Sequence, residues 1–148
     1  MTPIEAIQNI INVYNRAVDD REFERLHEVF DTESRYWLHG RLLTGTEAII
    51  AGLAKNFEDG RLSRHWTANT SIMDLDATSA RGLSDMFFME PRDGVWAMTI
   101  VGRYHDSYRH TGERWVIAER NTTYVAIPNA VSDLVARDWR EEEPQRAR

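Results

Sequence analysis

Apolar residues recur every three or four positions through the first part of the chain, a spacing typical of an amphipathic helix that buries one face. The positions of this stripe are Ile4, Ile7, Ile10, Ile11, Tyr14, Ala17 and Val18. Thr2 precedes the stripe as an N-cap, with Pro3 at the first helical position and Glu5 placed to complete a capping box. The pattern predicts a helix of about four turns that begins at Pro3.

Shorter elements follow between residues 21 and 57. The segment 21–30 is expected to form a short helix that turns Phe23, Leu26, Val29 and Phe30 inward, and 35–39 a short strand. The sequence Thr44-Gly45-Thr46-Glu47 opens a third helix that continues to about Phe57. The buried face of that helix is expected to consist of Ile49, Ile50, Leu53 and Phe57.

The pattern changes after Gly60, where β-like segments cover 64–74, 79–90, 94–108 and 113–126. Hairpin signals separate them at Asp76-Ala77-Thr78, Pro91-Arg92-Asp93-Gly94 and Thr111-Gly112. Helices followed by a meander of long strands predict an α+β fold, in which a curved antiparallel sheet wraps around the N-terminal helices as a cone. The open end of a cone is a pocket.

The end of the chain has a different character. Residues 130–139 are expected to form a terminal helix, and residues 141–148 are a charged segment that we expect to be disordered or solvated. With no internal repeat in the sequence, residues 1–140 are expected to form a single domain.

Composition narrows the function classes. The 148 residues carry a net charge of −6, which argues against nucleic acid or an anionic membrane surface as the main partner. The chain has no cysteine, which excludes disulfides, thiolate nucleophiles and Cys-ligated metals. No apolar run reaches the length of a signal peptide or a membrane span, so a cytoplasmic location is expected.

The residues with the clearest chemical potential are His65, at the start of a predicted strand, and Asp19, at the end of the first helix. Together they form the minimal set for a general base, because the carboxylate fixes the imidazole tautomer and stabilises the imidazolium. A carboxylate at a helix C-terminus is mildly unfavourable and therefore needs a partner. The alternatives are a histidine that caps a strand, and a solvated role for the neighbouring Asp20.

Other kinds of site find little support. His105 and His110 are five residues apart on a strand and a turn, so they are expected to point to opposite faces, and no metal site is expected. The sequence has no Gly-rich phosphate loop and no G-x-S-x-G motif, so neither a nucleotide cofactor nor serine hydrolysis is expected. The sequence thus predicts chemistry without a cofactor.

Arg120 and Tyr14 each admit two interpretations. Counting by twos from Trp115 places Arg120 on the opposite face of its strand, together with Val116 and Ala118. If that face lines the cone, Arg120 needs an anion; the alternative is a structural ion pair. Tyr14 lies on the apolar stripe and is either a core tyrosine or a ligand contact.

Three segments of the sequence resemble a known family. They are YNRAVDDREFERLHEVF at 14–30, HWTAN at 65–69 and GRYHDSYRHTGERWVIAERN at 102–121. Together with the order of helices and strands, they make residues 3–126 similar to the SnoaL-like branch of the NTF2-like superfamily. That branch includes scytalone dehydratase, bile acid 7α-dehydratase and hexachlorocyclohexane dehydrochlorinase.

The resemblance implies a proton-abstracting dyad, with His65 as the base and Asp19 as its acid partner. It also implies that Tyr14 contacts the substrate, that Arg120 is a functional arginine and that Tyr104 is a pocket aromatic. His39 lies near the place of a catalytic carboxylate in ketosteroid isomerase. Superfamily habit and the length of the strands lead us to expect a homodimer or homotrimer that associates through the outer face of the sheet.

The resemblance also has a departure. Dehydratases of this branch often carry a further His or Asp on the strand after the H-x-x-x-N segment, whereas here that stretch reads GLSDMFFME. Its inward positions are expected to be Ser84, Met86 and Phe88. We expect Trp37, His39, Met86, Phe88 and Tyr104 to contact a substrate.

The sequence therefore predicts a cofactor-free enzyme that acts on a hydrophobic, cyclic small molecule by proton abstraction, with elimination or isomerisation as the outcome. Two other functions stay open: a non-catalytic ligand-binding or assembly domain on the same scaffold, and an aldol-type polyketide cyclase.

Overall fold

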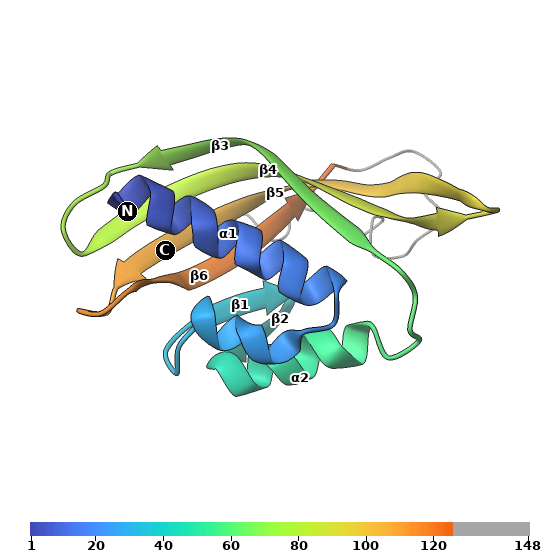
Figure 1. Ribbon diagram of the computed structural model, residues 1–148, viewed down its shortest axis with the longest axis horizontal. Helices are drawn as coiled ribbons and strands as arrows, with labels where there is room; N and C mark the ends of the chain where they lie inside the picture. The colour runs from blue at the N-terminus through green and yellow to red at the C-terminus, as the bar shows by residue number, and fades with distance from the viewer. Residues whose placement is uncertain (126–148) are drawn as a thin grey trace.

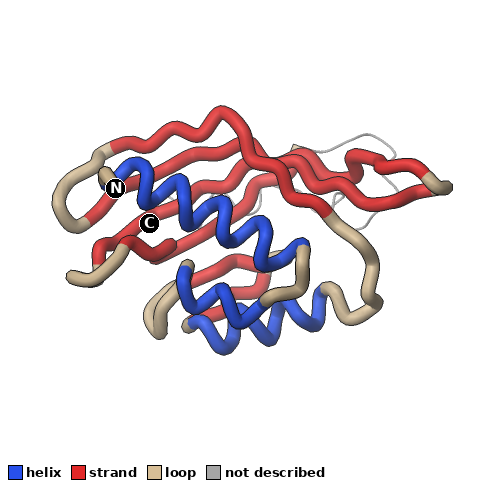
Figure 2. Tube along the Cα trace, viewed as in Figure 1, coloured by secondary structure: helices blue, strands red, loops and turns tan. Residues whose placement is uncertain are grey.

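Helix α1 (Pro3–Asp19) crosses one face of a curved six-stranded sheet in the computed structural model, which describes residues 1–125 (Figure 1). The helices gather on one side of the sheet, and the long strands lie behind them (Figure 2). This arrangement confirms the predicted α+β class with a curved, unclosed sheet around N-terminal helices. The predicted helix at 130–139 and the charged segment 141–148 lie outside the described residues.

The start of α1 follows from local chemistry. The Thr2 side chain accepts a hydrogen bond from the Glu5 amide at 3.3 Å, and the Glu5 carboxylate accepts one from the Thr2 amide at 2.6 Å. This reciprocal capping box satisfies two amides that no helical carbonyl can reach. The helix ends at Asp19, which places that carboxylate beside the first residues of the long strand β3.

The short elements differ in detail from the prediction. The segment Phe23–Glu28 is a 3-10 helix, η1, and α2 spans Thr46–Asn56. Strand β1 (Arg35–Leu38) turns through His39 and Gly40, both with positive φ, into β2 (Arg41–Thr44). The sequence analysis missed β2, because His-Gly is not among the dipeptides that mark a two-residue hairpin. His39 consequently lies in the turn and not on the strand.

The sheet has the order β2-β1-β6-β5-β4-β3. Its long strands are β3 (Arg64–Met73), β4 (Ser79–Arg92), β5 (Val95–His110) and β6 (Trp115–Tyr124), close to the four predicted segments. Neighbouring strands pair antiparallel except β1 and β6, which run parallel. This pairing places the β1–β2 hairpin beside the middle of β6.

Bulges change which side chains face the core. In the pairing of β5 with β6, Ser107 is opposite Glu119 and Tyr108 is opposite Ile117, so Ala118 is an extra residue. The bulge shifts the alternation by one position. As a result Arg120 lies on the inner face, where its guanidinium contacts the rings of α1 and β5, and not on the face of Val116 as the simple count predicted.

The core lies between α1 and the inner face of the sheet, and aromatic side chains fill much of it. Tyr14 of α1 is in edge-to-face contact with the rings of Phe30, Tyr36 and Tyr104, at centroid distances of 6.0–6.2 Å. Such contacts add to the burial of apolar area. Among the described residues, no helix is both long and apolar enough to span a membrane.

The turn between β3 and β4 gives a pH-dependent prediction. Asp76 accepts hydrogen bonds from the amides of Thr78 at 2.7 Å and Ser79 at 2.8 Å, and these bonds lower the pKa of its carboxyl to about 2. Because the folded pKa lies below the unfolded one, the stabilisation is complete above the unfolded pKa and is lost as the pH falls through the folded pKa.

We therefore expect Asp76→Asn to lower the melting temperature at pH 7, and the difference from the wild type to close between about pH 4 and pH 2. Thermal denaturation followed by circular dichroism across this range is the measurement. Asp93→Asn, in the β4–β5 turn, is the matched control and should show no such pH-dependent difference. A difference for Asp76→Asn that stays constant down to pH 2 would contradict the account.

Candidate active site

Asp19 and His65 meet where the end of α1 touches the start of β3. The Asp19 Oδ1 lies 2.7 Å from His65 Nδ1, and the Asp19 Oδ2 accepts the backbone N–H of His65 at 2.7 Å. The Ser63 hydroxyl also donates to Oδ1, at 3.1 Å. The two side chains are only 9% (His65) and 6% (Asp19) exposed. The carboxylate is thus held by three donors and fixes the imidazole in turn.

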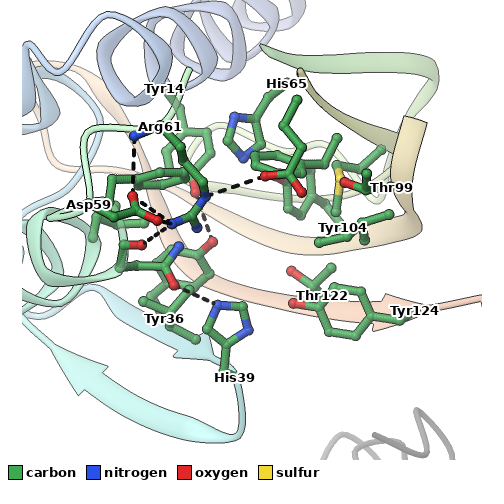
Figure 3. Close-up of a pocket in the computed structure, with 18 of the residues that line it drawn as sticks. Tyr14, Tyr36, His39, Asp59, Arg61, His65, Thr99, Tyr104, Thr122 and Tyr124 are labelled. Atoms are coloured by element: carbon green, nitrogen blue, oxygen red, sulfur yellow. Dashed lines mark hydrogen bonds and ion pairs between the residues drawn. The ribbon is translucent and has the colours of Figure 1, made fainter. Parts of the chain in front are cut away.

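The tautomer of His65 follows from this contact. An ionised carboxylate only accepts hydrogen bonds, so in the neutral imidazole the proton belongs on Nδ1 and the lone pair on Nε2. His65 lines an interior cavity, and among the described residues no hydrogen bond involves Nε2. The arrangement leaves a basic nitrogen available to a ligand in that cavity (Figure 3).

The cavity has a volume of about 400 Å³, within the usual size range for small-molecule sites. Ten of its nineteen lining residues are apolar or aromatic, and the other nine are polar or charged. The residues that line it include Tyr14, Tyr36, Leu38, Leu53, Phe57, His65, Met86, Phe88, Ile100 and Tyr104. Phe88 and Phe57 flank the imidazole, with ring centroids 4.9 Å and 6.2 Å from it. These rings cover part of the imidazole.

Tyr14 and Tyr36 form a buried hydroxyl pair in the cavity wall. Their oxygens are 2.8 Å apart, and the Tyr14 ring lies 6.4 Å from the His65 ring, centroid to centroid. Burial raises the pKa of both hydroxyls above the ordinary value of 10.0, although the Arg120 charge opposes this shift. Both groups are therefore protonated, and since only one hydrogen can lie between the two oxygens, the other is free to donate to a ligand.

Arg120 is fully buried behind these tyrosines. It forms a two-pronged pair with Asp106, with Nε–Oδ1 at 2.9 Å and Nη2–Oδ2 at 2.7 Å, and its guanidinium lies 4.4 Å from the Tyr14 ring centroid and 3.9 Å from that of Tyr104. Burial by itself lowers the pKa of Arg120, but the charge and hydrogen bonds of Asp106 outweigh it and hold this pKa well above its ordinary value. Arg120 thus stays charged.

This geometry matches the structural ion pair, the second of the two interpretations of Arg120. The side chain is not among the residues that line the cavity, and its described hydrogen bonds go to Asp106 and not to Asp19. Arg120 therefore supports the rings of Tyr14 and Tyr104 from behind instead of meeting a ligand. The structure therefore gives no support to the expectation that Arg120 stabilises charge on a ligand directly.

Four of the five residues expected to contact a substrate line the cavity, and one does not. Met86, Phe88, Tyr104 and the turn residue His39 line the cavity, and His39 Nε2 lies 3.2 Å from the Asn56 Oδ1 at its rim. Trp37 does not line it. Its neighbours Tyr36 and Leu38 do, and because side chains alternate along β1, Trp37 is directed to the other face of the strand.

The sequence analysis overlooked a charged cluster at the rim. Glu90 of β4 is buried at the cavity wall and pairs with Arg92 and with Arg61, whose Nε lies 3.5 Å from Glu90 Oε2. Arg61 also bonds Asp59 at 2.8 Å and lies over the Phe57 ring. Glu90 was detectable, because it continues the inward alternation of Ser84, Met86 and Phe88. Asp59 and Arg61 lie in the α2–β3 connection, where no helical or strand periodicity indicates which side chains face the cavity.

Within residues 1–125, no group of three or more His, Asp or Glu side chains is arranged to hold a metal ion. The described residues that carry chemistry in the cavity are an imidazole held by a carboxylate and a pair of buried hydroxyls, with aromatic rings beside them.

Comparison with known proteins identifies the family and the fold of the chain. A family model described as a SnoaL-like domain matches residues 1–121. Rv3472 of Mycobacterium tuberculosis, a protein of unknown function, is 18% identical with a TM-score of 0.78, over 90% of this chain and 82% of that one. Comparison with curated proteins finds no match.

Two further structures come from Novosphingobium aromaticivorans. A putative scytalone dehydratase is 17% identical with a TM-score of 0.70, over 82% of this chain and 83% of that one. The β subunit of a putative aromatic-ring-hydroxylating dioxygenase is 14% identical with a TM-score of 0.71, over 88% and 93%. At these identities the likeness shows a shared fold.

The buried ion pair gives a stability prediction. Asp106→Ala leaves the Arg120 charge uncompensated in the core, and we expect a loss of about 3–5 kcal/mol in the free energy of unfolding. The double variant Asp106→Ala with Arg120→Met removes both charges and should recover a large part of that loss. Urea denaturation measures both. A single variant within about 1 kcal/mol of the wild type would contradict the assignment of Arg120 as a buried, charged support.

Proposed function

The chain belongs to the SnoaL-like family, and from this premise we propose that it is a cofactor-free enzyme that abstracts a proton from a hydrophobic, cyclic small molecule. The observation that carries the proposal is the 2.7 Å contact between Asp19 Oδ1 and His65 Nδ1, with His65 at the wall of an aromatic cavity. A binding module has no need to orient a buried imidazole in this way.

In the proposed reaction His65 Nε2 takes a proton from a carbon next to a carbonyl or a leaving group. The charge that develops on the imidazole is stabilised by Asp19, and the Tyr14 hydroxyl donates a hydrogen bond to the carbonyl or leaving oxygen. The electron pair of the broken C–H bond then forms a double bond as the leaving group departs, which is elimination. If the proton returns at another carbon, the same step gives isomerisation.

The surroundings favour this chemistry on physical grounds. The rings of Phe57 and Phe88 flank the imidazole, and the low local dielectric beside apolar rings strengthens each hydrogen bond to the reacting atoms. The Tyr14 hydroxyl is protonated because burial raises its pKa, so it acts as a donor and not as a second base. The roles of His65 and Tyr14 are thus complementary.

The structural likeness to two kinds of protein bears on the alternatives. Likeness to a putative scytalone dehydratase fits the enzymatic proposal, whereas likeness to a dioxygenase β subunit favours an assembly role on the same scaffold. An aldol-type cyclase would use the same cavity with a longer ligand. We favour the enzyme because Asp19 and His65 are joined as a proton-abstracting pair requires, a constraint that an assembly subunit does not need.

Self-association is also part of the proposal. The outer face of the sheet exposes large apolar side chains: Trp66 of β3 is 61% exposed, and Trp96 and Met98 of β5 are 48% and 51% exposed. Phe87 lies next to Trp66 in the strand register and extends this outer apolar face. Clustered exposed apolar side chains are typical of protein interfaces.

The dyad is tested by proton exchange. Incubation of a panel of cyclic ketones and β-hydroxy carbonyl compounds in D2O, followed by NMR, measures abstraction at carbon for any compound that the wild type turns over. We expect His65→Ala to reduce this rate by about 10²–10⁴-fold, the usual size of a general-base contribution. Asp19→Asn should also reduce it, because an amide can stabilise the wrong tautomer.

His39→Ala is the matched control, since this histidine lines the rim and has no part in the dyad. It should change the rate much less. Folding of each variant is checked by circular dichroism. A compound exchanged equally fast by the wild type and His65→Ala would remove the imidazole from the mechanism.

The association is tested by light scattering. At micromolar concentration we expect two or three times the chain mass of 17.2 kDa, and a lower mass for Trp66→Lys, which places a charge on the outer apolar face. A wild-type protein that scatters as a monomer would refute the expected oligomer.

A further inference from the structure

Arg21 has a backbone conformation that is uncommon for its residue type. It follows Asp20, the C-cap of α1, and its φ of 61° lies in the left-handed region. Glycine usually takes this conformation after a helix end, because a Cβ is disfavoured there. Such strain persists only where surrounding contacts impose the conformation. The contacts of the Arg21 side chain supply the reason.

The Arg21 guanidinium spans the end of α1 and the segment that leads into β3. Its Nη1 donates to Ser63 Oγ at 3.0 Å and to the Asp19 carbonyl at 3.2 Å, and it also donates to the Val18 carbonyl. Its Nη2 donates to the Arg61 carbonyl. One planar group thus joins two carbonyls at the end of α1 to two residues of the α2–β3 connection.

The hydrogen bond from Arg21 determines what the Ser63 hydroxyl does. A guanidinium has no acceptor, so Ser63 Oγ accepts from Arg21 and keeps its single hydrogen for another partner. That hydrogen points to Asp19 Oδ1 at 3.1 Å, the same oxygen that lies 2.7 Å from His65 Nδ1. Ser63 is fully buried, so water does not compete for the hydrogen. Asp19 Oδ1 is therefore held between the serine hydroxyl and the imidazole.

The direction of these bonds cannot reverse. Burial lowers the pKa of Arg21 and the Asp19 carboxylate opposes this shift, but an arginine keeps its proton in proteins in either case. Arg21 therefore only donates, and Asp19, when ionised, only accepts. Ser63 is the one group of the three that could turn, and the arginine on one side and the carboxylate on the other fix its orientation.

Arg21 also contacts a ring beside the imidazole. Its guanidinium carbon lies 4.1 Å from the Phe57 ring centroid, and the Phe57 and His65 ring centroids are 6.2 Å apart. A guanidinium over an aromatic face is attracted by the quadrupole of the ring. Arg21 thus supports both neighbours of His65: the carboxylate through Ser63, and the ring of Phe57 directly.

We propose that Arg21 and Ser63 are positioning residues of the dyad: Arg21 orients the Ser63 hydroxyl, and that hydroxyl fixes the Asp19 oxygen that holds the imidazole. Neither residue is among those that line the cavity, so both act through Asp19 and not on a ligand. This inference rests on the proposed function for the use of the imidazole as a base. It adds to the pair a relay of donors that begins at the end of α1.

The relay is tested on the proton that Asp19 holds. In ligand-free protein labelled with ¹⁵N at histidine, NMR measures the rate at which the His65 Nδ1–H proton exchanges with water. We expect Ser63→Ala and Arg21→Met each to speed this exchange about tenfold, the effect of one lost hydrogen bond to a charged group. A wild type with no proton on Nδ1, or variants that exchange it at the wild-type rate, would overturn the relay.

A double variant distinguishes a relay from two independent supports. Because Arg21 acts on Asp19 through Ser63, Ser63→Ala with Arg21→Met should exchange about tenfold faster than the wild type, as each single variant does, and not about a hundredfold faster. Arg21→Lys keeps the charge without the planar fork and should resemble Arg21→Met. Additive effects, or full rescue by lysine, would contradict the proposal.

Ser34→Ala is the matched control for Ser63→Ala. Ser34 is also fully buried and also donates to an aspartate, Asp31 Oδ1 at 3.1 Å, but its partners do not belong to the dyad. Arg25→Met, in η1, controls for the loss of an arginine. Neither control should change the exchange at His65, and melting curves establish that each variant is folded. Equal acceleration by a control would indicate general loosening and refute the positioning role.

Proton exchange at carbon separates this inference from the proposed function. With 2-tetralone, a two-ring ketone, in D2O, Ser63→Ala and Arg21→Met should lower kcat about tenfold and leave KM within about twofold, because neither residue lines the cavity. Faster Nδ1–H exchange in the variants, beside a wild type that exchanges no ketone of the panel, would sustain the relay and contradict the enzyme. Ketone exchange by the wild type, with Nδ1–H exchange unchanged in the variants, would do the reverse.

Discussion

The hydrogen bond between Asp19 and His65 is the constraint on which the site depends. It joins the last residue of α1 to the second residue of β3, two elements far apart in the sequence, and it fixes both the helix end and the entry of the chain into the long strands. A carboxylate at a helix C-terminus is opposed by the helix dipole, so its position has a cost that local structure does not offset. The hydrogen bonds that Ser63 and His65 donate to the Asp19 carboxylate compensate this cost. One contact thus stabilises the fold and orients the imidazole.

Tyr14 connects this contact to the rest of the core. Its hydroxyl pairs with Tyr36, its ring lies close to those of His65 and Tyr104, and Arg120 lies behind it. A charged guanidinium in the core is tolerated because Asp106 compensates it, and the resulting ion pair supports the two rings that face the cavity. The site is therefore supported from behind by electrostatics and enclosed in front by aromatic rings.

Much of this could be predicted from local patterns, and the exceptions have physical causes. The capping box, the long strands and the dyad residues were identifiable because capping, alternation and the family resemblance each depend on few positions. Arg120 was placed on the wrong face because one inserted residue, Ala118, shifts the alternation, and a bulge has no signature in the sequence. Trp37 was assigned to the cavity by its residue type, although its strand directs it elsewhere. Glu90 was missed although the alternation through Phe88 pointed to it.

The central claim is that Asp19 holds His65 with its proton on Nδ1 and its lone pair on Nε2, and nitrogen NMR tests it most directly. Long-range proton–nitrogen correlation spectra of protein labelled with ¹⁵N at histidine distinguish the two tautomers of the neutral imidazole, with His65→Ala identifying the signal. The account predicts a protonated Nδ1 and a bare Nε2 in the wild type, with the balance shifted in Asp19→Asn. A neutral His65 with its proton on Nε2 in the wild type would contradict it.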